Sequence, residues 1–320
     1  MLFVTGGVNL GMETGDENPT GKEATEALMF LVNGVNIRCR IPVGYFFITS
    51  LTGEQLANLV RMCVGKLNEI NATVISLTTD GPASHVAMAR LLGAKFSDRC
   101  IDSYISEEQF LVWILDTSHM VKLVRNTWGD YEIFKFEDKQ ICWSFVNRLW
   151  ELQTSRSLHL RNKLTKKHIE YQQNKMKTKY ATQLFSSSVA DAIDFARDVL
   201  NLDEFKGSEE TTKFIRIMND IFDLQNTSNF RHHSYKKPMT TDNCEFLFLR
   251  MNECCDYLSK LTDENGLRLV KSKRKTGFLG LVMNCQSFIM ICERFIKTGR
   301  LKFLLTRRFS QDFLEHTFGR

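Results

Sequence analysis

The sequence predicts an α/β domain joined to a large all-helical block. Over residues 3–116, short apolar runs rich in β-branched and aromatic residues alternate with helical spacing, which is typical of an α/β sheet. From about residue 117 to residue 300, helical spacing is almost uninterrupted. Residues 301–320 read as an extended segment followed by a helix start. We expect three segments along the chain, at 1–135, 136–300 and 301–320.

The first segment contains four runs with the length and composition of strands: 27–35, 41–49, 73–79 and 110–115. Apolar residues recur at helical spacing over residues 52–70, between the second run and the third. Thr52, followed three residues later by Gln55, is typical of a capping box at the start of that helix. A strand, a helix and another strand at this spacing indicate a sheet covered by helices.

The second segment is expected to hold six helices, separated by short Gly, Asn and Pro signals: 141–152, 165–176, 180–200, 209–224, 244–261 and 279–297. In the third segment, residues 301–306 read as extended chain. Ser310 then has the residue type that favours a helix N-cap.

The composition is that of an ordinary globular protein, with 43% hydrophobic and 25% charged residues among 320. No apolar run reaches the roughly 18 residues of a membrane span, and no signal-peptide pattern opens the chain, so no membrane partner is expected. Nine scattered cysteines without paired spacing argue against a disulfide framework and a zinc module, and favour a reducing compartment.

Positive charge is concentrated in residues 117–180, where 13 Lys and Arg residues face 6 acids. Such clustering can neutralise phosphates and bind nucleic acid. A basic stretch on a helical chain is, however, more often a solvated helix face, and the residues alone leave both readings open.

Two acids end apolar strand patterns, which is where α/β sheets place functional groups. Asp80 ends the third run and precedes Gly81, which would allow a sharp turn, and Asp116 ends the fourth run. A carboxylate at such a position is partly desolvated and can be compensated by Mg²⁺, which prefers oxygen ligands. The alternative is that each is a turn or N-cap residue, because Asp favours both positions.

Eight short segments, read together, resemble the P-element transposase family and its vertebrate THAP-domain relatives. They occur in the order ATEAL at 24–28, PVGYFF at 42–47, SLTTDG at 76–81, DTSHMVKLVRN at 116–126, ATQLFS at 181–186, FDLQN at 222–226, TGFLG at 276–280 and SQDFLE at 310–315. The resemblance implies a ribonuclease-H-like mixed sheet with a helical GTP-binding insertion, and residues 301–320 as the return to that core. It also implies a nuclear protein that cuts and joins DNA with divalent metal, Mg²⁺ or Mn²⁺, and uses GTP as a cofactor.

The resemblance carries roles over to individual positions. Asp80 and Glu315 match the second and third acids of the catalytic triad and would bind the metal, and Asp116 is kept as a metal-site candidate beside them. On the nucleotide side, the matching positions are Asp223 and Asn226 for the purine, Asp312 on the final helix, and Lys163 and Lys177 for the phosphates.

The chain also departs from the family pattern. The family's first catalytic Asp lies on the opening strand, residues 1–9 supply no acid, and Thr5 stands where the family often has Asp. The THAP domain is absent, and the chain stops shortly after Glu315. We therefore expect a fragment or inactive copy of a transposase catalytic region. The alternative is a domesticated GTP- and DNA-binding module without catalysis; a helical scaffold without ligand and a homo-oligomeric state also stay open.

Overall fold

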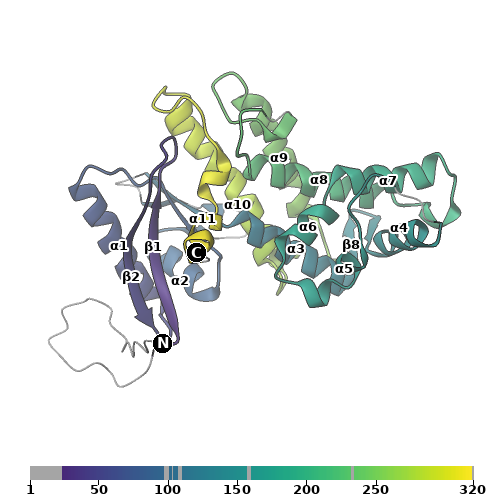
Figure 1. The fold of residues 1–320 in the computed structure, drawn as a ribbon, viewed down its shortest axis with the longest axis horizontal. Coiled ribbons are helices and arrows are strands. Elements are labelled where there is room, and N and C mark those ends of the chain that lie inside the picture. The colour runs from purple at the N-terminus through teal and green to yellow at the C-terminus, as the bar shows by residue number, and fades with distance from the viewer. Residues whose placement is uncertain are drawn as a thin grey trace. The chain divides into compact units, whose positions relative to one another are not determined.

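The computed structural model describes residues 24–96, 101–102, 104–106, 110–156, 160–231 and 234–318. The chain forms two compact units (Figure 1). The N-terminal unit combines Met1–Ile114 with Gln311–Arg320, and the helical unit is Leu115–Ser310. The end of the chain thus belongs to the same unit as its start. The expected boundaries at 135/136 and 300/301 remain a prediction about domains.

The N-terminal unit opens with an antiparallel hairpin of β1 (Glu26–Asn33) and β2 (Arg40–Ile48), with a bulge between Phe30 and Leu31. Helix α1 (Gly53–Glu69) follows and begins at the expected capping box. The Gln55 amide donates to Thr52 Oγ1 at 3.2 Å, and the Thr52 amide donates to Gln55 Oε1 at 3.0 Å. The prediction of this helix and its cap is confirmed.

The apolar face of α1 builds the core of this unit together with helix α2 (Ala83–Leu91). Its buried members are Leu56, Ala57, Val60 and Met88, and side chains from β1 and β3 pack against them. Burying a Leu or Val side chain contributes about 1.5–3 kcal/mol, so this cluster fixes the helices on the strands.

Strand β3 (Ser76–Thr79) is shorter than predicted and belongs to a three-stranded sheet of order β3–β7–β6. Strand β7 (Leu111–Leu115) is fully buried and pairs antiparallel with β6 (Tyr104–Ser106). Buried Trp113 donates from Nε1 to Thr79 Oγ1 at 3.0 Å, which ties β7 to the end of β3 just before Asp80. The remaining elements of this unit are a small pair of β4 (Lys95–Phe96) with β5 (Ile101–Asp102), and α11 (Asp312–Phe318).

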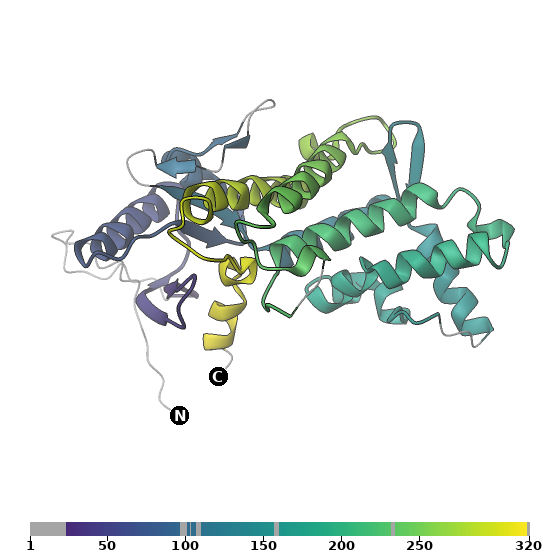
Figure 2. The ribbon, with the colours of Figure 1, turned by 90° about the horizontal axis from the view of Figure 1, so that it is seen from above.

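The helical unit begins with α3 (Thr117–Tyr131) and a hairpin of β8 (Ile133–Phe136) and β9 (Lys139–Cys142). Figure 2 shows its later helices α9 and α10 running side by side. Its other helices and turns are α4 (Ser144–Ser155), α5 (Lys166–Ile169), η1 (Tyr171–Asn174), α6 (Thr178–Leu184), α7 (Ser187–Asp198), η2 (Asp203–Phe205), α8 (Glu209–Gln225), η3 (Ser234–Lys236), α9 (Cys244–Lys260), η4 (Leu269–Lys271), α10 (Thr276–Ile291), the π-helical turn η5 (Cys292–Ile296) and η6 (Thr306–Phe309).

Three predicted helices are wrong in detail. The helix expected over 141–152 begins only at Ser144, because Ile141 and Cys142 belong to β9. The helix expected over 165–176 is the short α5 followed by the 3₁₀ turn η1. The helix expected over 180–200 is broken at Ser186, whose extended backbone (φ −117°, ψ 147°) starts α7 anew.

Trp128 on α3 lies at the centre of the helical unit's core. Its ring stacks on Phe185 at 6.0 Å and meets Trp143 and Phe214 edge-on at 5.0 and 5.2 Å. Edge-on and stacked pairs of this kind contribute about 0.5–1.5 kcal/mol each beyond burial. This cluster joins α3 and α8 to the N-cap residue of α4 and the C-cap residue of α6.

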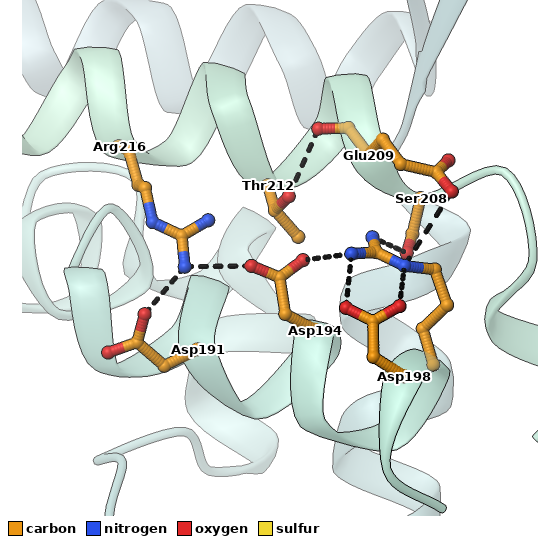
Figure 3. Close-up of polar contacts among 8 residues, drawn as sticks. Asp191, Asp194, Asp198, Ser208, Glu209, Thr212 and Arg216 are labelled. Carbon is orange, nitrogen blue, oxygen red and sulfur yellow. Dashed lines mark hydrogen bonds and ion pairs between the residues drawn. The ribbon is translucent and has the colours of Figure 1, made fainter. Parts of the chain in front are cut away.

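Helices α7 and α8 are also joined by a network of ion pairs at their surface (Figure 3). Arg216 contacts Asp191 at 2.6 Å and Asp194 at 2.7 Å. Arg197 contacts Asp194 at 3.0 Å and Asp198 at 2.7 Å, and donates to Ser208 Oγ at 3.1 Å. Asp194 is therefore shared by both arginines.

The segment Thr276–Ile296, which is α10 with its π turn, is long and apolar enough to cross a membrane by length and composition. This differs from the sequence expectation, which considered only unbroken apolar runs. Within the apolar window, 61% is buried inside the molecule, and α10 packs against α3, α8 and α9. Its packing is that of a core helix.

Candidate functional site

The carboxyl end of α8 carries the strongest candidate site, built around Asp223. The Asp223 side chain is 16% exposed, and its Oδ1 lies 2.9 Å from Lys236 Nζ of η3. Asn219, one turn earlier on α8, donates from Nδ2 to Asp223 Oδ2 at 3.3 Å. Burial raises the pKa of Asp223, whereas the bond to Lys236 opposes that rise. The result is a half-buried carboxylate held between a cation and an amide.

Asn226 is the C-cap of α8, with φ −131° and ψ 32°. The next residue, Thr227, closes the helix end because its Oγ1 donates to the Asp223 carbonyl at 3.0 Å. Its amide donates to Thr306 Oγ1 at 2.9 Å, and Thr306 Oγ1 donates to the Leu224 carbonyl at 2.8 Å. Two of the last carbonyls of α8, those of Asp223 and Leu224, thus accept from threonine hydroxyls, which restrains this helix end.

A buried hydrogen-bond network contacts this helix end through Gln225, and the sequence patterns did not predict it. Asn284 of α10 accepts from the Leu115 amide at 2.8 Å and donates to the Leu115 carbonyl at 2.6 Å. Its Nδ2 also lies 3.1 Å from Gln225 Oε1, which accepts from Thr117 Oγ1 at 3.1 Å. The available signal was an asparagine inside the strongly apolar segment Thr276–Ile291, since a buried amide must find partners.

The lysines expected on the phosphate side both lie in the helical unit. Lys177 is exposed and is the N-cap residue of α6, whereas Lys163 is exposed in the segment before α5. Asp312 opens α11 and belongs to the N-terminal unit. The structure therefore brings Asp223 and Asn226 together on one helix end, and places the two lysines in the same unit.

Asp116 has a structural role in this unit. It is buried, and as the N-cap of α3 it accepts from the His119 amide at 2.8 Å. An N-cap of this kind contributes about 1 kcal/mol to helix stability. The N-cap alternative weighed for Asp116 is thus observed, and its assignment as a metal-site candidate stays a prediction.

Asp80 ends β3, and Gly81 after it has φ +80°, the left-handed conformation that allows the expected sharp turn. The Asp80 side chain is 47% exposed, and its Oδ1 lies 3.2 Å from Nδ1 of His85 at the start of α2. Glu315 is exposed on α11, within the same unit.

A pair of divalent metals requires several acids around one point. No group of three or more His, Cys, Asp or Glu side chains that could hold a metal ion occurs in the part of the chain that the structure describes. Thr5, at the position of the first acid in the resemblance, lies outside the described residues. The described donors thus do not form a complete two-metal set.

Two family models match the chain. Residues 3–93 match a model described as "TNP-like, RNase H N-terminal domain", and residues 118–238 match one described as "TNP-like, GTP-binding insertion domain". The second model contains the whole of α8 together with Asp223, Asn226, Lys163, Lys177 and Lys236.

Two curated proteins are similar over most of this chain. The DNA transposase THAP9 of Homo sapiens is 29% identical across 96% of the chain, and the transposable element P transposase of Drosophila melanogaster is 27% identical across 90%. The chain spans only 34% and 37% of those proteins, about a third of their length.

The fold matches a solved structure titled "Drosophila P element transposase strand transfer complex", with a TM-score of 0.77 and 23% identity. The match covers 93% of this chain and 65% of the other. It confirms the predicted fold class, an RNase H-like α/β core combined with a large helical part. On the two family models, the two relatives and the shared fold, this chain belongs to the P-element-like transposase family.

Proposed function

We propose that the helical unit binds GTP at the end of α8, and that the chain acts as a nuclear GTP- and DNA-binding module of transposase type whose strand cleavage is lost. The observation that carries the proposal is the Asp223 carboxylate, half-buried and paired with Lys236. It lies within the residues that match the GTP-binding insertion model. The adjacent cation favours the ionised form that a purine-reading acceptor needs.

An ionised carboxylate is suited to guanine, because it can accept from both the ring N1–H and the exocyclic amine. Adenine presents no such pair of donors on that edge. A carboxylate offers about four acceptor positions, and Asp223 uses two of them for Lys236 and Asn219. Asn226 lies three residues later and so faces the same side of the helix end. Lys163 and Lys177 are proposed as phosphate contacts, and the nucleotide role that the resemblance assigns to Asp312 stays a prediction.

DNA is the second proposed ligand of the chain. Residues 117–180 carry 13 basic residues against 6 acids, and several of these lysines are exposed, including Lys166, Lys167 and Lys179. Exposed lysines of this density can contact the phosphate backbone without reading sequence. The expected binding is salt-dependent, with affinity falling steeply as ionic strength rises.

A second candidate function is DNA strand cleavage and transfer with Mg²⁺ or Mn²⁺ at Asp80 and Glu315. It is favoured by the return of the chain, because Gln311–Arg320 joins the unit that contains β3. The described donors leave the metal set incomplete, so we rank this function below nucleotide binding.

The test of nucleotide binding is a calorimetric titration of GTP with Mg²⁺ into the whole chain. We expect saturable binding to the wild type and an affinity about 10- to 100-fold weaker for Asp223→Ala, since each charge-assisted hydrogen bond contributes about 1.5–3 kcal/mol. Asp256→Ala removes an exposed acid that pairs with Lys260 on α9, and it should bind GTP as the wild type does. Absence of GTP binding, and of any thermal shift with GTP, would favour the scaffold alternative.

The two candidate functions are separated by an assay on labelled DNA that carries a terminal repeat. The proposal expects DNA binding but no cleavage with Mg²⁺ or Mn²⁺. Cleavage that disappears in both Asp80→Ala and Glu315→Ala would instead establish the second candidate and overturn the loss of activity.

A further inference from the structure

Arg125 is the one residue of the DTSHMVKLVRN segment that combines complete burial with a formal charge in the part of the chain described here. It lies on α3 and has 0% exposure. Burial lowers its pKa to about 10, so the guanidinium stays charged at neutral pH. A buried cation is costly unless it is paired, which makes its partners informative.

The partners of Arg125 are oxygens without formal charge. Its Nη2 donates to the carbonyls of Asn174 and Lys175 at 3.1 and 3.2 Å, and its Nε donates to Asn126 Oδ1 at 2.8 Å. Its Nη1 is buried and has no hydrogen-bond partner. The charge therefore fixes a piece of backbone, and it is not neutralised by any ion pair among the described residues.

The backbone that Arg125 binds, at Asn174 and Lys175, lies just before Lys177 in the chain. The Asn174 carbonyl that accepts from Arg125 also accepts from the Lys177 amide at 3.1 Å. One oxygen thus joins the buried guanidinium to the residue that begins α6. The side chain of Asn126 adds a longer contact from Nδ2 to the Lys175 carbonyl at 3.5 Å.

A second anchor holds the start of the same connection on α3. Tyr171 lies against Gly129, where a Cβ atom would approach the ring to 2.3 Å, so only glycine allows this contact. The Tyr171 hydroxyl donates to Asp130 Oδ1 at 2.7 Å, and Asp130 also pairs with Arg274 at 2.8 Å. Residues 171–177 are therefore fixed at both ends against one helix.

We propose that Arg125 is a positioning residue for the phosphate side of the nucleotide site, fixing residues 174–177 so that Lys177 meets the phosphates of GTP. The unneutralised positive charge adds to that of Lys177 and favours a polyanion over an uncharged nucleoside. This proposal rests on the proposed GTP binding, and it identifies α3 as the element that sets phosphate recognition, separately from base recognition at Asp223.

The test compares the affinities of GTP, GDP and GMP for the wild type, Arg125→Met and Arg125→Lys. If phosphate positioning is lost in Arg125→Met, the affinity for GTP should fall about tenfold while the affinity for GMP stays nearly unchanged. Affinity would then depend less on the number of phosphates. Arg125→Lys keeps the charge but cannot hold both carbonyls and Asn126 in one geometry, so it should recover only part of the loss. A merely structural role would weaken all three nucleotides equally, and that result would overturn the proposal.

Two further variants keep the test decisive. Asn126→Ala removes one acceptor of Arg125 and leaves the buried charge in place, so it can be measured even where Arg125→Met does not fold. It should also reduce the gain in affinity from GMP to GTP. Arg148→Met removes an exposed arginine that donates to the Glu204 carbonyl in the same unit and should leave the series unchanged. Wild-type protein that binds no GTP would overturn the proposed function itself, whereas GTP binding with an unaltered series in the Arg125 and Asn126 variants would overturn only the role of Arg125.

Discussion

The two units hold their candidate acids in opposite ways. Asp80 stands at a strand end with 47% of its side chain exposed, and His85 lies beside it. Asp223 is 16% exposed, pairs with Lys236 and accepts from Asn219. A mostly buried carboxylate whose oxygens are oriented by neighbours is prepared to read a fixed donor pattern, whereas a more exposed one is accessible to water and ions. The difference teaches that the helical unit is the better prepared of the two for a ligand.

The two units also differ in how completely they bury their apolar side chains. The helical unit buries an aromatic core and a polar network that joins α3, α8 and α10. In the N-terminal unit, alternate residues of β2 expose apolar side chains, including Tyr45 with 67% of its surface accessible. Variants in the two units should therefore differ in how much they lower the free energy of unfolding.

Asn284→Leu should cause the largest loss of stability. It removes the partner of both backbone groups of Leu115 and of Gln225, leaving several buried polar atoms unsatisfied at about 1–3 kcal/mol each. We expect the free energy of unfolding to fall by about 3 kcal/mol or more, measured by urea denaturation.

The matched variant in the N-terminal unit is Thr79→Val, which loses the single bond from Trp113 and should cost about 1 kcal/mol. Asn252→Leu, on an exposed face of α9, should change stability by less than about 0.5 kcal/mol. Equal losses for Asn284→Leu and Thr79→Val would contradict the contrast between the units.

His168 should make the stability of the helical unit depend on pH. It is buried and belongs to a capping box with Thr165, and burial lowers its pKa below the ordinary 6.5. The unfolded chain therefore binds a proton at a higher pH than the folded chain does. Stability is complete above pH 6.5 and is lost as the pH falls through the depressed folded pKa.

The variant His168→Gln keeps a residue type that suits the third position of a capping box and removes the titration. Thermal unfolding at pH 8 and pH 5.5 should show a smaller acid-induced loss for this variant than for the wild type. An identical loss in both proteins would show that His168 does not carry this pH dependence.

Asp194→Ala should give the smallest effect. It removes the acid shared by Arg197 and Arg216 in the network of Figure 3, and surface ion pairs contribute about 0–1 kcal/mol. We expect a loss of stability of about 0.5–1 kcal/mol that shrinks in high salt. Asp203→Ala, which breaks one isolated exposed pair with Lys206, should produce no measurable change. A loss for Asp194→Ala that is independent of salt would argue against an electrostatic origin.

Sequence patterns predicted the local features of this fold well. The capping box at Thr52, the turn at Gly81 and the starts of α8 and α9 depend on residues that are adjacent in the chain. The hairpin of β8 and β9 was not predicted, because Ile141 and Cys142 also suit the apolar spacing of the helix that follows them. Local propensity cannot separate two patterns that share the same residues.

In the candidate site, too, the sequence indicated some residues but not the partners that hold them. The positions of Asp223 and Asn226 came from their resemblance to a known family, whereas their partners depend on tertiary contacts. Lys236 lies on a separate turn, and Asn284 contacts Leu115, which is 169 positions away. Two of the three acceptors of Arg125 are backbone carbonyls, which no side-chain pattern reveals.

The most direct test of the central claim is a competition between GTP and ATP for the wild-type chain, measured by calorimetry at one salt concentration. The proposal has the Asp223 carboxylate accept from two donors that guanine has and adenine lacks, so it predicts that GTP binds at least about tenfold more tightly than ATP. Equal affinities for the two nucleotides would contradict base recognition at the end of α8.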